Sequence, residues 1–411
     1  MKTSALVSNA SKRLQTLDAI LATSLFLGLE RNNHTFSLGL LIAWIGIRCG
    51  QQIWKNRHGQ DWPTRILPFI IILGLTTFQA RTIIRLDDNP GGSIYILLSA
   101  CMLIAANYNQ VQKIRLTRWI NVAAFCIYTK IIALGFAEGI NPFSGEWMVN
   151  INNDLLKMGF GRINSLASML AYFAVIGFYG FRTEKNNSFM ALHATSFSIG
   201  FFLCLNSTSN MAIGAPIIAI SASLILFSRD YKLRPSINRY TPSIIIGSAC
   251  LGLIAAWELS LKQKYIAGEH YRLNEWRCWL ENSILAGNNK IIHGLGYNLE
   301  KISSICQNNN PDGGLVQLIS QHGLLGLASI SILLIYLFKC ISYSRTIEQK
   351  KGQNTSLIKC RQSEASTGMI LTVIMCNIVT PSYNGSYFNA GLIGIILSLA
   401  VFTGTSREVV R

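Results

Sequence analysis

Apolar runs of helical length alternate with polar connections along most of the chain. A helix needs about 20 apolar residues to cross a bilayer, and the runs lack the short alternation of an outer-membrane barrel. The pattern therefore predicts an all-α integral membrane protein with about twelve transmembrane helices, 1–411 forming a single polytopic domain. The runs are centred near 16–30, 35–49, 65–80, 91–107, 118–137, 163–181, 189–206, 211–228, 241–261, 314–338, 367–382 and 388–405.

Two long polar stretches interrupt this pattern. The first is a loop over 262–313, part of a segment from Tyr271 to Leu327 that is rich in Arg, His, Trp, Gly and Asp. The second covers 341–365 and is expected to be a solvated loop. Because side chains with chemical function are concentrated in the first stretch, we expect the site in the 262–313 loop.

Composition agrees with the membrane class. Half of the 411 residues are hydrophobic and 13% are charged, with a mean hydropathy of +0.34. Soluble domains carry about 25% charged residues. The chain is therefore expected to lie in a membrane.

The distribution of Lys and Arg predicts the orientation of the chain. If both termini are cytoplasmic, the inside segments hold 24 of the 36 basic residues and seven acidic ones, and thus the whole net charge of +17. The first apolar run lacks a small-residue cleavage site and is expected to be a signal anchor. We therefore expect a multi-pass protein of the bacterial inner membrane, with the 262–313 loop on the outer face. The basic charge indicates attraction to membrane lipids, not to nucleic acid.

The spacing of the cysteines does not match that of a metal-binding motif. The ten cysteines include no C-x-x-C pair, and no H-E-x-x-H occurs. Only Cys278 and Cys306 lie in the outer loop, where they could form a disulfide or stay buried as thiols. There is no P-loop or Rossmann fingerprint, which argues against nucleotide chemistry in the cytosol.

The polar segment contains three ordered elements. They are Arg272-Leu-Asn-Glu-Trp276, then Gly294-Leu-Gly296-Tyr297, then Leu315-Val-Gln317 leading to Gly323 and Gly326. This order resembles the signature loop of the O-antigen ligase and O-antigen polymerase superfamily. The resemblance implies a metal-independent membrane glycosyltransferase without a cofactor. Its donor would be an undecaprenyl-diphosphate-linked glycan, and its acceptor a sugar hydroxyl on another glycan or on lipid A-core.

Two positions depart from the family pattern. Where the family has His-Asn, this chain has Asp312-Gly313. Where its ligases have Ser-Arg at the start of a mid-chain span, this chain has Asn210. The base and one substrate-binding group would therefore differ here.

The resemblance assigns roles to the charged residues of the loop. Arg272 would bind the leaving diphosphate, because a guanidinium bonds phosphate oxygens with two N–H groups and keeps its charge. It could instead cap a loop helix or pair with a nearby glutamate. Asp312 would take the proton from the acceptor hydroxyl, although its Pro-Asp-Gly-Gly context also fits an ordinary helix N-cap. His270 and His293 are alternative bases, or structural loop histidines.

Further residues would bind the diphosphate or glycan. Arg81 and Arg85 are one helical turn apart and share a face, although they could instead pair with Asp87 or Asp88 to hold a loop. The resemblance adds a set from the start of two spans and from the motif loop: Arg162, Asn164, Asn210, Trp276, Gly294 and Gly296.

Lys130 lies inside an apolar run and is therefore a functional candidate. Its expected partner is Glu138 or Glu258.

The predicted function is glycan transfer or polymerisation in surface polysaccharide assembly, whether O-antigen, capsule or exopolysaccharide. One alternative is a flippase for lipid-linked oligosaccharides, which should show symmetry between halves and lack a long outer loop. Another is a member of the superfamily that binds the glycolipid without transferring it.

Overall fold

The structure is a computed structural model. It describes residues 16–28, 33–56, 101, 108, 110–137, 139, 141, 163–206, 210–228, 270–284, 291–292, 294–295, 300–306, 316–328, 331, 353–379, 393 and 395–396. Throughout this part of the chain, every regular element is a helix, which confirms the all-α class. Besides Thr16–Leu27 and residues 316–328, the helices are α2 (His34–Asn56), α5 (Gln110–Ala137), α6 (Ile163–Thr183), α7 (Asn187–Leu205), α8 (Asn210–Ser228), α11 (His270–Ile284), α13 (Glu300–Cys306) and α15 (Gln353–Val379).

Three helices are long and apolar enough to cross a membrane by length and composition: Val111–Ala137, Leu166–Thr183 and Asn187–Leu205. Shorter apolar helices cover Thr16–Leu27, Thr35–Gln51 and Ala212–Leu224. All six lie on runs that the sequence predicts to span. Most of 65–80, 91–107, 241–261 and 388–405 lies outside the described residues, so the total of about twelve spans stays a prediction.

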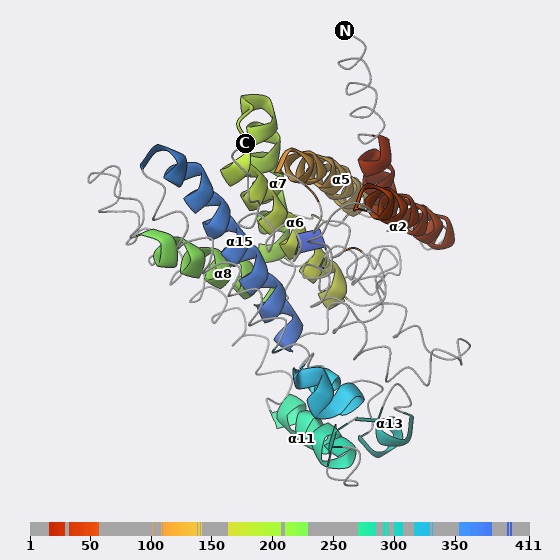
Figure 1. The fold of residues 1–411 in the computed structure, drawn as a ribbon. Coiled ribbons are helices and arrows are strands. Elements are labelled where there is room, and N and C mark those ends of the chain that lie inside the picture. Colours follow the sequence, from red (N-terminus) through yellow and green to blue (C-terminus); the bar gives the residue numbers. More distant parts are fainter. Residues whose placement is uncertain are drawn as a thin grey trace.

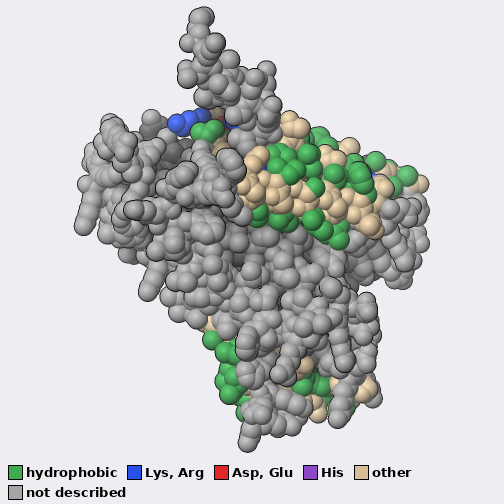
Figure 2. All heavy atoms as spheres, turned by 45° about the vertical axis from the view of Figure 1, so that its right-hand side comes forward, with side chains coloured by type: hydrophobic (Ala, Val, Ile, Leu, Met, Phe, Trp, Pro, Cys, Tyr) green, Lys and Arg blue, Asp and Glu red, His purple; other side chains and the backbone are tan. Residues whose placement is uncertain are grey.

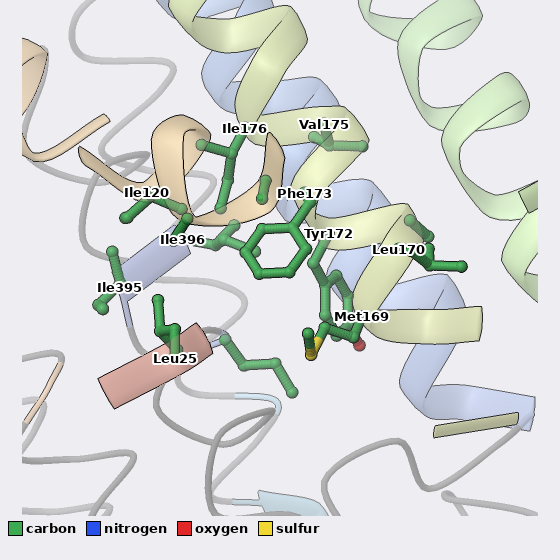
Figure 3. Packing of buried hydrophobic residues seen from close by; sticks show 14 of the residues in the cluster. Leu25, Ile120, Met169, Leu170, Tyr172, Phe173, Val175, Ile176, Ile395 and Ile396 are labelled. Atoms are coloured by element: carbon green, nitrogen blue, oxygen red, sulfur yellow. The ribbon is translucent and has the colours of Figure 1, made fainter. Parts of the chain in front are cut away.

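Helix α6 is the centre of the main bundle (Figure 1). Its residues from Leu166 to Gly180 are buried all round, and it contacts α5, α7, α8 and α15. In Figure 3, Phe173 and Ile176 point toward Ile120 of α5, while Leu170 projects from another side of the helix. A helix that is apolar on every face is buried among other helices or lies in a membrane, and α6 is enclosed by its four neighbours.

Pairs of contacts define the directions of the neighbouring helices. Arg182 of α6 bonds Glu364 of α15, and Tyr172, ten residues earlier, accepts a hydrogen bond from Asn377 at 3.0 Å. The two helices are therefore antiparallel. By the same reasoning α5 is antiparallel to α6, because Arg118 meets Glu184 while the ring of Tyr128 lies edge-on to Phe173.

Two glycines let α7 approach α6 closely. A Cβ at Gly177 would lie 2.8 Å from the backbone nitrogen of Phe197, and one at Gly180 would lie 2.6 Å from the ring of His193. Between helices in a bilayer, association depends on close van der Waals packing, since lipid tails are as apolar as the side chains. These glycines therefore provide the α6–α7 contact surface.

Buried ion pairs join helices at one end of the bundle. Arg182 bonds Glu364 at 2.7 Å, and the carboxylate of Glu364 is fully buried. The side chain of Arg118 bonds Glu184, just beyond the end of α6, at 2.7 and 2.9 Å. Both ion pairs lie at the end of the bundle where α6 ends.

A third buried pair joins the first two apolar helices. Arg48 of α2 bonds Asp18 of the helix Thr16–Leu27, and its guanidinium lies 5.0 Å from the ring centre of Tyr108. A charge is buried at small cost only when a partner satisfies it. These ion pairs therefore determine which helix ends meet.

The polar stretch at 341–365 was expected to be a loop, and this is wrong for its second half. Residues from Gln353 onward continue into α15, and Glu364, Ala365 and Ser366 are buried. The reason lies in the tertiary structure. Glu364 was expected to be exposed to solvent, but it forms an ion pair with Arg182 of α6, which compensates its charge in a buried position.

Lys130 contacts an aromatic ring of a neighbouring helix. Its ammonium lies over the ring of Phe26, 5.6 Å from the ring centre, in the geometry of a cation–π contact. The expected partners Glu138 and Glu258 lie outside the described residues.

The outer surface of the described helices is largely apolar. In Figure 2, hydrophobic side chains are interspersed with other atoms on the part of the described helices that is visible, and Lys and Arg atoms lie mainly near the upper edge. Phe36, Ile42, Val111 and Phe136 are each more than half exposed. An apolar surface of this extent is typical of helices that face lipid.

The glycine contact between α6 and α7 predicts a specific loss of stability. Gly177→Ala should lower the free energy of unfolding by about 1–3 kcal/mol, because the new Cβ meets backbone that cannot move aside. Gly46→Ala is the matched control: a Cβ there meets nothing within 4 Å, and alanine favours the helix by up to about 1 kcal/mol. Thermal unfolding in detergent measures both. Equal effects would contradict the packing described for Gly177.

Candidate functional site

The polar segment forms a helical unit of its own. It consists of α11, α13 and the helical residues 316–328, which Figure 1 shows beyond the lower end of the main bundle. Its small core contains the buried side chains of Trp279, Ile302 and Val316. Four side chains pack around that core: Trp276, Leu280, Leu295 and Cys306. The segment predicted as a loop is thus largely helical within its described residues.

Helix α11 turns one face toward this core. Glu275, Trp279 and Ser283 are all buried, and they are spaced four residues apart, so they lie in one row along the helix. Arg277 faces away: its side chain is 77% exposed, and among the described residues it bonds Glu281 on the neighbouring turn. Helix α11 therefore has one face buried against this core and one face exposed.

A disulfide between Cys278 and Cys306 joins α11 to α13. Of the two states that the sequence left open, the structure adopts the paired one. The bond closes a loop with a sequence separation of 28, so it restricts the unfolded chain as well as joining the helices.

Two glycines bring the motif elements together. Gly294 and Gly323 both have positive φ, 68° and 59°. A Cβ on Gly294 would lie 2.4 Å from the carbonyl of Gln321, and one on Gly323 would lie 2.6 Å from the nitrogen of Gly294. Next to this contact, the backbone N–H of Leu295 donates to the carbonyl of Ser320 at 2.9 Å. Only glycine fits at both positions, for conformation and for space.

Gly323 has this positive φ within residues 316–328, which are helical throughout. On the turn before it, Ser320 accepts a hydrogen bond from Ser283 of α11 at 3.1 Å, which joins the two segments.

Buried polar groups gather around this contact. Gln317, Gln321 and His322 are each at most 5% exposed, on the turns just before Gly323. Among the described residues, the indole nitrogens of Trp276 and Trp279 and the side-chain oxygen of Gln317 have no hydrogen-bond partner. Buried donors and acceptors usually have partners, so these three groups are available to a polar ligand.

The predicted site residues fall into two sets. In the described part, His270 and Arg272 lie in the first turn of α11, Asn164 is the second residue of α6, and Asn210 is the first of α8. Trp276 and Gly294 belong to the helical unit formed by the polar segment. Six predicted residues lie outside the described residues: Arg81, Arg85, Arg162, His293, Gly296 and Asp312.

Arg272 precedes Glu275 and Trp276 by three and four residues. In a helix this spacing places the three Cα positions on one face, the face that α11 turns toward residues 316–328. The role of Arg272 in the site stays a prediction.

Asn164 and Asn210 lie at one end of the main bundle. The thiol of Cys204, near the end of α7, contacts the carbonyl of Ala167, near the start of α6, at 3.8 Å. Since α8 begins shortly after α7 ends, both asparagines are at this end, opposite the ion pair between Arg118 and Glu184.

Sequence reasoning missed Glu275, Trp279, Ser283 and Ser320 as parts of this unit. The four-residue spacing in α11 was visible in the sequence and indicates a buried row. Ser320 gave no signal, since its role depends on Leu295 and Ser283 reaching it. The described residues include no group of three His, Cys, Asp or Glu side chains placed to bind a metal.

The disulfide yields a measurable expectation. Replacing Cys278 and Cys306 together by Ser should lower the free energy of unfolding by about 3–4 kcal/mol through the loss of the loop constraint. Each single variant should expose one thiol to maleimide without reductant. Cys126→Ser is the control, because that thiol is exposed and not in a disulfide, and its effect should be near zero. Labelling of both loop cysteines in untreated wild type would overturn the assignment.

No protein-family model matches this chain, and no curated protein sequence matches it either. The functional assignment therefore depends on the residues of the polar unit and on their arrangement.

Proposed function

We propose that this protein is a membrane glycosyltransferase of the O-antigen ligase or polymerase type. It would transfer or polymerise a glycan from an undecaprenyl-diphosphate donor on the outer face of a bacterial inner membrane. The observation that supports this most is the convergence of three motif elements in one unit. The helix that carries Arg272 and Trp276, the Gly294 turn and the turns before Gly323 meet around one glycine contact.

The reaction requires two groups. The acceptor hydroxyl oxygen bonds to the anomeric carbon of the donor sugar while the bond from that carbon to the diphosphate oxygen breaks. Asp312 accepts the hydroxyl proton, and Arg272 stabilises the negative charge that develops on the leaving undecaprenyl diphosphate. His270 and His293 are the alternative proton acceptors within the same segment.

The buried polar groups of the unit suit a sugar ligand. Trp276 and Trp279 offer indole N–H donors, and Gln317 offers an acceptor, all without partners among the described residues. Sugars present hydroxyls that both donate and accept, and apolar ring faces that pack on indoles. These three side chains are therefore proposed to contact the glycan.

The remaining proposed contacts surround the unit. Asn164 and Asn210 begin two helices at one end of the bundle, where a lipid-linked substrate would approach from the membrane. Arg81, Arg85 and Arg162 are proposed to bind the diphosphate, and Gly296 to complete the Gly-x-Gly turn.

Arg272→Ala should lower the transfer rate about 100- to 1,000-fold, because the charge on the leaving diphosphate loses its stabilisation. Asp312→Ala should lower it about 100- to 10,000-fold through loss of the base. The measurement uses purified protein in proteoliposomes, with polyprenyl-diphosphate glycan and acceptor, and follows product by mass spectrometry. Arg277→Ala is the matched control: Arg277 lies on the same helix, is exposed and pairs with Glu281, so the variant should keep full activity.

Donor binding distinguishes the alternatives. Full transfer activity in both the Arg272 and Asp312 variants would overturn the assignment of these residues. Saturable binding of the donor glycolipid by wild type, without any transfer, would identify a binding protein. Movement of the glycolipid across the vesicle bilayer without transfer would identify a flippase.

A further inference from the structure

Burial along the helical segment 316–328 changes sharply at Gly323. Seven of the eight residues from Val316 to Gly323 are buried. From Leu324 to Ala328 no residue is buried, although the helix continues. These five residues read Leu-Leu-Gly-Leu-Ala, so the helix leaves the polar unit as an exposed apolar helix.

Lipid is the environment that suits this exposed stretch. It belongs to the predicted span 314–338, and no charged residue occurs from Leu324 to Phe338. The exposed Ser331 donates its hydroxyl hydrogen to the carbonyl of Leu327 at 2.8 Å. A serine that bonds its own helix can face lipid, because its donor is satisfied without water.

A second segment meets the helix where this stretch begins. A Cβ on Gly323 would lie 2.6 Å from the carbonyl oxygens of both Ile291 and Ile292. Ile292 is 48% exposed, and Leu324, which follows Gly323 in the chain, is 51% exposed. Two large apolar residues beside one backbone contact therefore form a single exposed patch.

Exposed charge lies on a different side of the unit. Arg277 and Glu281 form an exposed ion pair on the face of α11 opposite the buried row of Trp279 and Ser283. Ser283 bonds Ser320, so the buried row faces residues 316–328. In Figure 1 that segment, in light blue, lies between α11 and the main bundle. The unit is thus amphipathic.

We infer that the polar unit docks on the bilayer surface through Ile292 and Leu324. Gly323 would lie at the membrane boundary, with the residues after it in lipid and the buried residues before it in the unit. A stable protein partner requires about 800 Å² on each side, far more than two side chains provide. Shallow insertion next to a span needs only a few apolar side chains in the interface.

Docking of this kind would hold the proposed site close to the membrane. Gln317 precedes Gly323 by six residues, which is about 9 Å along a helix. The diphosphate of a lipid-linked donor lies at the level of the headgroups, so the polar row before Gly323 would be near it. The docking itself does not depend on the glycosyltransferase proposal, because neither Ile292 nor Leu324 has a role in that reaction.

The test places the photocrosslinking residue p-benzoylphenylalanine at single positions of the full-length protein. The protein is held in nanodiscs of phosphatidylethanolamine and phosphatidylglycerol, and adducts are identified by mass spectrometry after irradiation. Replacement of Ile292 or of Leu324 should each give a phospholipid adduct. Replacement of Arg277 is the matched control, because this residue is exposed on the opposite face of α11, and it should give none. An Ile292 variant that forms adducts only with a second copy of the chain, or forms none, would overturn the inference.

Wild type offers a second measurement that needs no substitution. In the same nanodiscs, oxidation of Ile292 by hydroxyl radicals should be nearly absent relative to the urea-unfolded protein, because lipid excludes water from the patch. If the patch faced water, the exposed fraction of 48% would allow about half of the oxidation of the unfolded chain. That outcome would contradict docking. Protection of Cys278 and Cys306 from maleimide shows that the unit is folded in each crosslinking variant.

Discussion

The close contact between α6 and α7 is the interaction on which the rest of the bundle depends. Helix α6 is buried from Leu166 to Gly180, and the glycines at 177 and 180 allow α7 to approach it at backbone distance. Once α7 is in place, α5 and α15 cover the remaining faces. In a bilayer no hydrophobic effect drives these helices together, so shape complementarity must supply the stability.

The two ends of α6 are chemically different. At the end where α6 finishes, the pairs of Arg182 with Glu364 and of Arg118 with Glu184 neutralise buried charge and fix helix directions. Beyond the other end lies the unit of α11, α13 and residues 316–328. Charged side chains therefore serve packing at one end, and are proposed to serve chemistry at the other.

The polar unit has its own stabilisation. A disulfide joins α11 to α13, and the contact between Gly294 and Gly323 joins two segments that are distant in sequence. Such a unit, with few apolar side chains in its core, gains much from a covalent link and from backbone contacts. In the proposed transfer reaction, its rigidity would hold the proposed glycan-binding side chains in place.

The sequence by itself determined the apolar helices, the all-α class and the concentration of polar side chains in one segment, because hydrophobic periodicity and span length are local properties. It did not reveal the helices α11 and α13 or the first half of α15, whose residues are polar. It did mark Gly294 as important through the Gly-x-Gly pattern, and the row of buried residues in α11 could have been found from its spacing. Only the tertiary structure decided that Cys278 pairs with Cys306, that Glu364 is buried against Arg182, and that Lys130 lies over Phe26. Each of these depends on two residues from different helices meeting, and no local pattern specifies which partner a buried charge or thiol will find.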